Sequence, residues 1–488
     1  MATIRELLAF GEKLIQAGDL PRADHVIRKI LEFDPSAASA WYLLGVVNQL
    51  RGKLVDSVAN YEQVIRLEPN HHQALNNLGV ALQAQGRVTD AEACLRRALH
   101  ANVDHAEAHS NLGNLLQDQG KLDEAVACYR RAVHLRPDYL DAHNNLGNAL
   151  RAQARLAEAA ACYDQALLLQ PDHPQVHLSR ALCRLQMGDF EQGWAEYEWR
   201  LKCKDFSIPA FRQPVWDGAP LDGRSILLYA DHGLGDTLQF IRYAPLVRER
   251  GGRVILHCQP LLARLVASCP GIEQVIVAGT LLPEFEVYSP LMSLPRILGT
   301  TLDSVPAEVP YLTADESLVG QWSRELDPAR GCKIGIVWQG NPRYRRDRER
   351  SFRLAQLEPV ARLADVRLFS LQNGLGTEQL GEVESRFPVT DLGGRLADFM
   401  EIAAVMRNLD LVITPDTSLA HLAGALGVPV WVALSFAPDW RWLADRLDSP
   451  WYPTMRLFRQ TTRGDWDDLF ERIASEMEAR IRTEDKAR

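Results

Sequence analysis

The sequence repeats itself every 34 residues through its first part, and the repeat then stops. Leu-Gly pairs recur at this spacing, and so do the large residues that follow them, at Leu44-Gly45, Leu78-Gly79, Leu112-Gly113, Leu146-Gly147, Tyr61, Leu95, Tyr129 and Tyr163. A period of this length predicts stacked units, each too small to bury its apolar face alone. The spacing is lost near Trp199, so the rest of the 488 residues must fold in another way.

The repeated residues resemble the tetratricopeptide pattern, in which each unit is a pair of antiparallel helices. The glycine lets the two helices approach closely, and a proline ends the second helix in most units. We expect units over 4–37, 38–71, 72–105, 106–139 and 140–173, and a last, altered unit from residue 174. Trp194, Tyr197 and Trp199 crowd this last unit, and we expect them to seal the stack against the next domain.

Asparagine recurs on the expected first helices, although it is a poor helix former. The positions are Asn76, Asn77, Asn111, Asn114, Asn144, Asn145 and Asn148. One interpretation is a row of amides that hydrogen-bonds an extended peptide on the concave face. The other is solvated surface, or hydrogen bonding between helices. Both remain open, and in either case the repeats predict a protein or peptide partner.

From residue 224 the chain alternates short apolar strands with helices, which predicts parallel sheets covered by helices. Strands are expected over 225–230, 253–258, 274–277, 333–338, 366–371, 409–414 and 429–434, and helices over 237–250, 260–268, 356–363, 399–408, 418–426 and 467–482. Two successive lobes of this kind form a cleft at the carboxyl ends of their strands, which is the plan of GT-B glycosyltransferases. The expected fold class is α + α/β: a solenoid over 1–207, a Rossmann-like lobe over 208–320, and a nucleotide-sugar-binding lobe with a closing helix over 321–488.

Composition excludes several other classes. The net charge of −9 argues against general nucleic-acid binding. The apolar runs are far shorter than the roughly 20 residues of a membrane span, and the first residues lack a signal-peptide pattern, so we expect no membrane span and a cytoplasmic protein. The eight cysteines have no metal-ligand spacing, and no acidic D-x-D pair lies in a suitable loop, so no metal is expected.

A glycine-rich loop follows the first expected strand, with the sequence Asp231-His232-Gly233-Leu234-Gly235-Asp236. It is not G-x-G-x-x-G, so a nicotinamide cofactor is not expected. Asp236 has two interpretations. It is a helix N-cap, for which aspartate is among the best residues, or a general base at the cleft, kept ionised by the helix N-terminus.

The second lobe has a matching turn, in which Asp416, Thr417 and Ser418 precede His421 by one helical turn. Free amides and hydroxyls at a helix N-terminus bind phosphate, and the histidine can donate to a diphosphate. The alternative is a helix cap with a partly buried histidine. The two hydroxyls beside the histidine, at a strand-to-helix switch, favour the phosphate-binding interpretation.

A basic run over 341–353 interrupts an acidic chain. Arginine is suited to bidentate phosphate contacts, and Arg350-Ser351-Phe352 is the part of the run that we expect at the phosphate. The remaining arginines are expected to be surface. Residues at the ends of two neighbouring strands are expected to line the cleft or hold the nucleotide: Gln339, Gly340, Asn341, Ser370 and Gln372.

Together these motifs resemble glycosyltransferase family 9, the heptosyltransferase family. The resemblance implies that Asp236 is the catalytic base, that the turn from Asp416 to His421 binds the donor, and that Arg350 occupies the position of a phosphate-binding lysine. Ser418 stands where that family has glycine, and Asp231-His232 are additional, which leaves the donor sugar open. Stretches such as 190–199, 233–243 and 439–443 resemble bacterial tetratricopeptide-repeat proteins with this kind of C-terminal region.

The sequence thus predicts a metal-independent, inverting glycosyltransferase that needs no cofactor. Its donor substrate is a nucleotide-diphospho-sugar, of hexosyl or heptosyl class, and its acceptor is a protein or glycan presented by the repeats. The rival predictions are a repeat scaffold whose second half has lost catalysis, and a regulator that binds sugar nucleotides. Both carboxylates, the histidine and the arginine are present together, which argues against lost catalysis.

Overall fold

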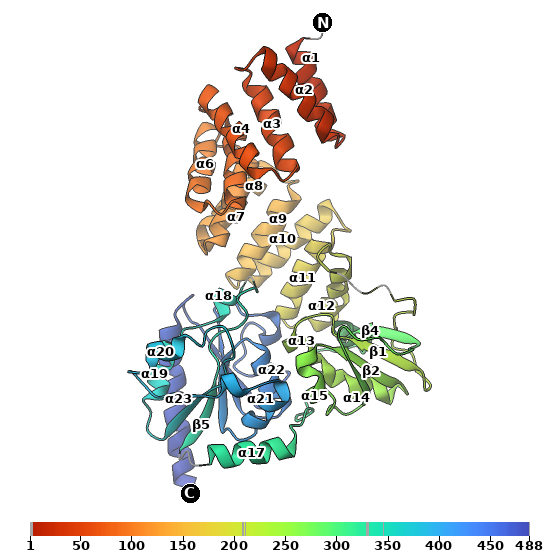
Figure 1. The fold of residues 1–488 in the computed structure, drawn as a ribbon, viewed down its shortest axis with the longest axis vertical. Coiled ribbons are helices and arrows are strands. Elements are labelled where there is room, and N and C mark those ends of the chain that lie inside the picture. Colours follow the sequence, from red (N-terminus) through yellow and green to blue (C-terminus); the bar gives the residue numbers. More distant parts are fainter. Residues whose placement is uncertain (1–2, 207–208, 210, 328–330, 345, 488) are drawn as a thin grey trace. The chain divides into compact units, whose positions relative to one another are not determined.

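The computed structural model describes residues 3–206, 209, 211–327, 331–344 and 346–487 (Figure 1). The chain forms two compact units, Met1–Ser179 and Arg180–Arg488. Their division falls inside α11 (Pro174–Gln186), within the last repeat. The expected boundary at 207/208 lies outside the described residues, and the one at 320/321 falls inside α17 (Glu316–Leu326).

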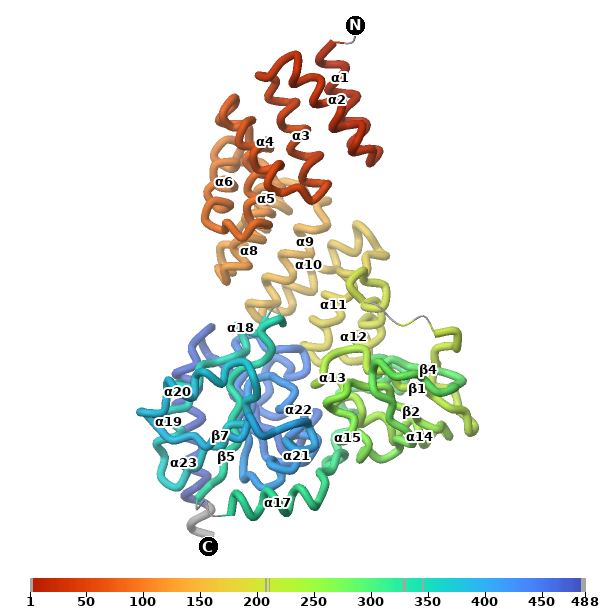
Figure 2. The backbone as a smooth tube through the Cα atoms, viewed as in Figure 1, coloured from red at the N-terminus to blue at the C-terminus, as the bar shows by residue number. Residues whose placement is uncertain are grey.

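The first unit is built of antiparallel helix pairs, which Figure 2 follows along the chain. They are α1 (Ile4–Gln16), α2 (Leu20–Phe33), α3 (Ala38–Leu50), α4 (Leu54–Leu67), α5 (His72–Ala84), α6 (Val88–Ala101), α7 (Ala106–Asp118), α8 (Leu122–Leu135), α9 (Leu140–Ala152) and α10 (Leu156–Leu169). The first helices begin at or next to the expected unit boundaries, so the predicted 34-residue solenoid is confirmed.

The Leu-Gly glycines pack directly against the residues that repeat with them. A methyl group on each glycine would lie 2.5–2.7 Å from its partner, in the pairs Gly45–Tyr61, Gly79–Leu95, Gly113–Tyr129 and Gly147–Tyr163. These four partners are completely buried. Glycine is therefore required here by contact distance, because any side chain would push the two helices of a unit apart.

The recurring asparagines bond between helices and between units. Examples are Asn111 Nδ2 to Asn76 Oδ1 at 2.9 Å, Asn145 Nδ2 to Asn114 Oδ1 at 3.0 Å, and the hydroxyl of Tyr163 to Asn148 Oδ1 at 2.9 Å. These contacts match the second of the two interpretations. The first two of these bonds link neighbouring units, in addition to apolar packing.

The first α/β lobe has a parallel sheet in the order β3-β2-β1-β4. Its elements are β1 (Ser225–Tyr229), α13 (Leu234–Phe240), η2 (Ile241–Tyr243), α14 (Ala244–Glu249), β2 (Arg253–Cys258), η3 (Pro260–Leu262), α15 (Ala263–Val266), β3 (Ile272–Val277), β4 (Val287–Pro290), η4 (Leu291–Ser293) and α16 (Leu294–Ile297). The single helix expected over 237–250 is wrong. The structure has two α-helices in its place, α13 from Leu234 and α14 from Ala244. The break lies before Pro245, whose ring clashes with the preceding helical turn.

The second lobe has a parallel sheet in the order β10-β9-β8-β5-β6-β7. Its elements are β5 (Cys332–Ile336), α18 (Asp347–Arg350), η5 (Leu354–Leu357), α19 (Glu358–Ala361), β6 (Val366–Ser370), α20 (Gln379–Val383), β7 (Thr390–Asp391), η6 (Gly393–Arg395), α21 (Phe399–Met406), β8 (Leu411–Pro415), α22 (Ser418–Ala425), β9 (Val430–Leu434), η7 (Trp440–Trp442), β10 (Met455–Arg459) and α23 (Trp466–Ala487). This is the doubly wound Rossmann order, which reverses between β5 and β8 and places ligands outside that point.

The closing helix α23 packs within the second lobe, on α19, η5 and β10. Phe470 lies with its ring centroid 4.6 Å from that of Phe352, in the same buried cluster as Trp338. Phe352, which lies within the basic run, is therefore part of this core and not of a phosphate contact. No helix among the described residues is both long and apolar enough to cross a membrane.

The last repeat contributes α12 (Phe190–Tyr197) and η1 (Glu198–Lys202) to the second unit. Trp194 is buried against Phe240, Trp440 and Trp451, with ring centroids 5.9, 5.1 and 6.4 Å away. The first of these residues belongs to one lobe and the other two to the second lobe. The seal predicted from the aromatic residues is confirmed for Trp194, which packs against both lobes at once.

Replacing Gly113 with alanine tests the helix contact in the repeats. The added methyl group would lie 2.6 Å from the Tyr129 ring, and such overpacking costs about 2 kcal/mol. We expect urea denaturation to show a lower free energy of unfolding for Gly113→Ala. Gly320→Ala is the matched control, because the space around this helical glycine is open and alanine favours a helix. Equal stability of the two variants would contradict the contact.

Candidate functional site

The loop of the first lobe and the turn of the second lobe meet at Gly235. A methyl group there would lie 3.0 Å from His421 Cδ2 and 3.4 Å from Ser418 Cα. Thus α13, which follows β1, packs its first turn onto the first turn of α22, which follows β8. The structure brings the two predicted motifs together, and glycine permits the contact.

Asp236 lies in the first turn of α13, but it is not the N-cap. Gly233 is the N-cap, and its amide donates to Asp236 Oδ2 at 2.9 Å. The other carboxylate oxygen, Oδ1, accepts a hydrogen bond from Arg441 Nη2 of the second lobe. The side chain is 23% exposed, so Asp236 is both partly accessible and paired with a cation.

Arg441, which sequence reasoning missed as a site residue, lies in η7. Its Nε donates to Gln239 Oε1 and its Nη1 to Asp439 Oδ1, both at 2.7 Å, and its guanidinium lies 4.4 Å from the Trp440 ring centroid. Burial lowers the pKa of Arg441, but the carboxylates of Asp439 and Asp236 raise it above its ordinary value. The available signal was the resemblance of residues 439–443 to other repeat proteins.

The additional Asp231 and His232 anchor the glycine-rich loop to η1. Arg200 Nη2 donates to Asp231 Oδ2 at 3.1 Å, and the Tyr197 hydroxyl lies 3.2 Å from His232 Nε2. The Asp231 side chain is 1% exposed. Burial alone would raise the pKa of Asp231, but the contact with His232 and the charge of Arg200 lower it. The last repeat therefore holds the loop on which Asp236 lies.

In the second lobe, Thr417 is the N-cap of α22 and Ser418 is its first residue, so Asp416 is not the cap. The Thr417 hydroxyl lies 3.0 Å from that of Thr414. Burial and the neighbouring carboxylate of Asp439 raise the pKa of Asp416 to about 6, although Arg350 and Arg441 oppose this. The amides at this N-terminus lie at the carboxyl end of β8, beside the switch point of the sheet.

His421 is buried behind this turn. Its Nδ1 lies 2.9 Å from the Tyr452 hydroxyl, and its ring stacks on Trp442 at 5.3 Å. Burial, with the charges of Arg441, Arg242 and Arg350, holds the pKa of His421 well below its ordinary value. The imidazole is therefore neutral at pH 7, and it donates from Nε2 when Tyr452 donates to Nδ1.

Arg350, at the end of α18 after β5, bonds to the turn after the neighbouring strand β8. Its Nη1 donates to the Asp416 carbonyl at 2.7 Å and its Nε to Asp347 Oδ1 at 3.0 Å, and the guanidinium lies 4.6 Å from the Tyr344 ring centroid. Ser351 Oγ accepts from the Gly340 amide at 3.0 Å and donates to Asp347 Oδ2 at 3.2 Å. Arg345, in the same basic run, lies outside the described residues.

The remaining predicted residues mostly shape the loop after β5. Gln372 Oε1 accepts from the Trp338 and Gln339 amides at 3.2 and 3.1 Å, and its Nε2 donates to the Gln339 and Leu375 carbonyls at 3.1 and 2.8 Å. Asn341 Oδ1 accepts from the Arg343 amide, at 3.0 Å. The Ser370 hydroxyl is buried and has no hydrogen-bond partner within the described chain.

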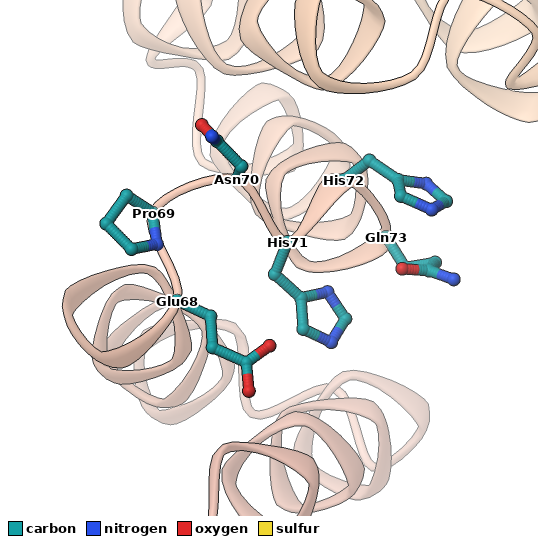
Figure 3. A pocket seen from close by; sticks show the side chains of 6 residues that line it. All are labelled: Glu68, Pro69, Asn70, His71, His72 and Gln73. Carbon is teal, nitrogen blue, oxygen red and sulfur yellow. The ribbon is translucent and has the colours of Figure 1, made fainter.

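Two hollows lie away from these residues. One, shown in Figure 3, is lined by Glu68, Pro69, Asn70, His71, His72 and Gln73 in the repeats, with the side chains of Glu68 and His71 on the same side. The other lies between α19 and α23 in the second lobe. Among the residues that the structure describes, no group of three or more histidine, cysteine or acidic side chains is placed to hold a metal ion.

Comparison with protein families agrees with both parts of the chain. Tetratricopeptide-repeat models match residues 8–59, 50–115, 113–153 and 140–173. The model of "Glycosyltransferase family 9 (heptosyltransferase)" matches residues 360–435, which include the turn from Asp416 to His421 but not Asp236. The chain therefore combines tetratricopeptide repeats with a glycosyltransferase family 9 region, and this region supports a glycosyltransferase.

Individual relatives resemble parts of the chain. Protein FlbA of Caulobacter vibrioides is 26% identical over 331 residues, which are 62% of this chain and 54% of that protein. The chain thus spans about half the length of this relative. Among solved structures, TTC0263, a thermophilic tetratricopeptide protein of Thermus thermophilus, is 23% identical (38% of this chain, 100% of that chain, TM-score 0.33). The Pseudomonas aeruginosa pilF structure is 21% identical (41% and 89%, TM-score 0.37). At these TM-scores the structural likeness carries no argument about function.

The buried ion pair under the loop has a measurable energy. Arg200→Met leaves the Asp231 carboxylate buried without its cation, and removing one partner of such a pair costs about 3–5 kcal/mol. We expect urea denaturation to show this loss, and the double variant Arg200→Met with Asp231→Asn to recover part of it. Strictly additive losses would show that the two residues do not interact.

The raised pKa of Asp416 predicts a pH-dependent stability. The folded carboxyl loses its proton around pH 6, whereas the unfolded one loses it around pH 3.8, so the stability from this group falls as the pH rises between these values. We expect Asp416→Asn to be more stable than the wild type at pH 7.5, by roughly 3 kcal/mol, and nearly equal at pH 3.5. Equal thermal unfolding of both proteins at pH 7.5 would refute the shift.

Proposed function

We propose that the chain is a metal-independent, inverting glycosyltransferase that uses a nucleotide-diphospho-sugar. One observation carries the proposal: the carboxylate-bearing turn of α13 and the N-terminus of α22 meet at Gly235, beside the switch point of the second sheet. A helix N-terminus at such a point is suited to a phosphate. The acceptor hydroxyl and the leaving diphosphate would then be handled at one place by groups from opposite lobes.

In this mechanism Asp236 takes the proton of the acceptor hydroxyl. The hydroxyl oxygen forms its bond to the anomeric carbon as the bond from that carbon to the diphosphate breaks, and this single displacement inverts the anomeric centre. The amides of Thr417 and Ser418, the guanidinium of Arg350 and Nε2 of His421 receive the charge of the leaving group. Three arginines act at this place, since the charges of Arg441, Arg242 and Arg350 add to burial in lowering the pKa of His421.

The other residues act by position. Gln339, Gly340 and Asn341 line the cleft, and the buried Ser370 hydroxyl lies at the end of β6, towards the nucleotide. Ser351 and Gln372 hold the loop after β5 through the bonds described above. The tetratricopeptide repeats present the acceptor, which we propose to be a protein or a glycan attached to one.

A second function, as a regulator that binds sugar nucleotides without turnover, is favoured by a different contact. Both oxygens of Asp236 are engaged, one by the Gly233 amide and one by Arg441. A carboxylate held in this way is not free to take a proton. Binding without turnover is the outcome that would establish this second function.

Calorimetry with UDP-, GDP- and ADP-sugars, followed by assays of donor hydrolysis and transfer, tests the proposal. We expect one class of donor to bind and to turn over, and Asp236→Asn to keep binding while turnover falls by about a thousandfold. Arg350→Ala should weaken donor binding by about tenfold, because a charge-assisted contact is lost.

Arg348→Ala is the matched control, since Arg348 is an exposed arginine of the same helix α18 and should leave donor affinity unchanged. The absence of binding to every donor would reject the proposed function. Turnover that survives Asp236→Asn would remove Asp236 as the base.

A further inference from the structure

The contact between Arg441 and Asp236 links the lobes directly at the site. The two residues are 205 positions apart in the chain, and only 11% of the arginine side chain is exposed. The arginine cannot drift away, because Asp439, Gln239 and the face of Trp440 hold its other sides. Its Nη2 is thus the end of the guanidinium that faces the candidate base.

Arg441 also lies close to the turn at the start of α22. After burial, its charge is the largest contribution to the lowered pKa of His421, whose ring touches the position of Gly235. The same charge acts on Asp416, at the end of β8. Geometry agrees with this: Trp442, the next residue after Arg441, stacks on His421, and Gly235, the residue before Asp236, lies against Ser418. The guanidinium that pairs with Asp236 is therefore near the first turn of α22.

A diphosphate at the start of α22 would compete with Asp236 for this guanidinium. Arginine binds phosphate oxygens at least as well as a carboxylate, through charge-assisted hydrogen bonds. A doubly charged ligand outweighs a single carboxylate at similar distance. The competition requires only that Nη2 turn from one oxygen to another, while Nη1 and Nε remain on Asp439 and Gln239.

We infer that Arg441 is a positioning residue that masks Asp236 until a donor diphosphate arrives and takes its Nη2 contact over. The inference rests on the proposed function for the identity of the ligand and of the base. With the diphosphate bound, Asp236 Oδ1 is free to accept the acceptor proton. The electron pair of the breaking bond between the anomeric carbon and oxygen leaves with the diphosphate, whose charge then lies against Arg441. The base is therefore released only when a leaving group is present.

Competition between Asp236 and a diphosphate for Arg441 can be measured from binding affinities alone, without turnover. If Asp236 holds Arg441 in the free protein, then Asp236→Asn releases the arginine, and inorganic pyrophosphate should bind about tenfold more tightly than to the wild type. Arg441→Ala should bind pyrophosphate about tenfold more weakly. In the double variant the gain from Asp236→Asn should vanish, because it acts only through Arg441.

Calorimetry of the full chain with pyrophosphate measures these four affinities, and thermal unfolding confirms that each variant is folded. Arg264→Ala is the matched control: it removes another ion pair between the lobes, to Asp398 at 2.9 Å, and should leave pyrophosphate affinity unchanged. Arg441→Lys, which keeps the charge, should restore part of the affinity.

Unchanged affinity in Asp236→Asn, or a gain that persists without Arg441, would overturn the inference, as would the absence of pyrophosphate binding in all variants. Failure of the proposed function would give a different result from failure of this inference. A protein that binds pyrophosphate with the expected pattern but turns over no nucleotide sugar keeps the competition and loses the catalytic role.

Discussion

The close packing of α13 on α22 is the contact on which the site depends. It brings a loop after β1 and a turn after β8 to the same place, and it exists because residue 235 has no side chain. Buried polar contacts then hold the lobes around it: Arg242 donates to the Trp451 carbonyl at 2.6 Å and to the Tyr311 hydroxyl at 2.9 Å. Burial of this arginine is tolerated because its hydrogen bonds are satisfied.

The second helix of the last repeat, α12, packs as part of the glycosyltransferase-like unit. Trp194 packs on residues of both lobes, and Arg200 is buried beneath the glycine-rich loop with Asp231, Glu198 and Ser293. The last tetratricopeptide repeat thus supports, from below, the loop that carries Asp236. A displacement of α12 would also disturb this loop, because the guanidinium of Arg200 contacts both Tyr197 of α12 and Asp231 of the loop.

The fold was largely readable from the sequence, because periodicity and apolar strands are local signals. The repeats and strands such as β1, β2 and β9 lie within a few residues of their expected positions. The strand β7 has two residues, and β4 ends in a proline, so neither has a clear pattern. The pairing of Arg441 with Asp236 could not be predicted, since it arises only when segments 205 positions apart fold together.

The division of the chain inside α11 has a consequence for the evolution of proteins with this domain order. The residues before Arg180 form one compact unit, whereas those from Arg180 onward form a second unit that includes α12, the second helix of the last repeat. Recombination that adds or removes 34-residue units upstream of α11 leaves this body intact. The length of the repeat array can therefore change while the fold of the second unit stays the same.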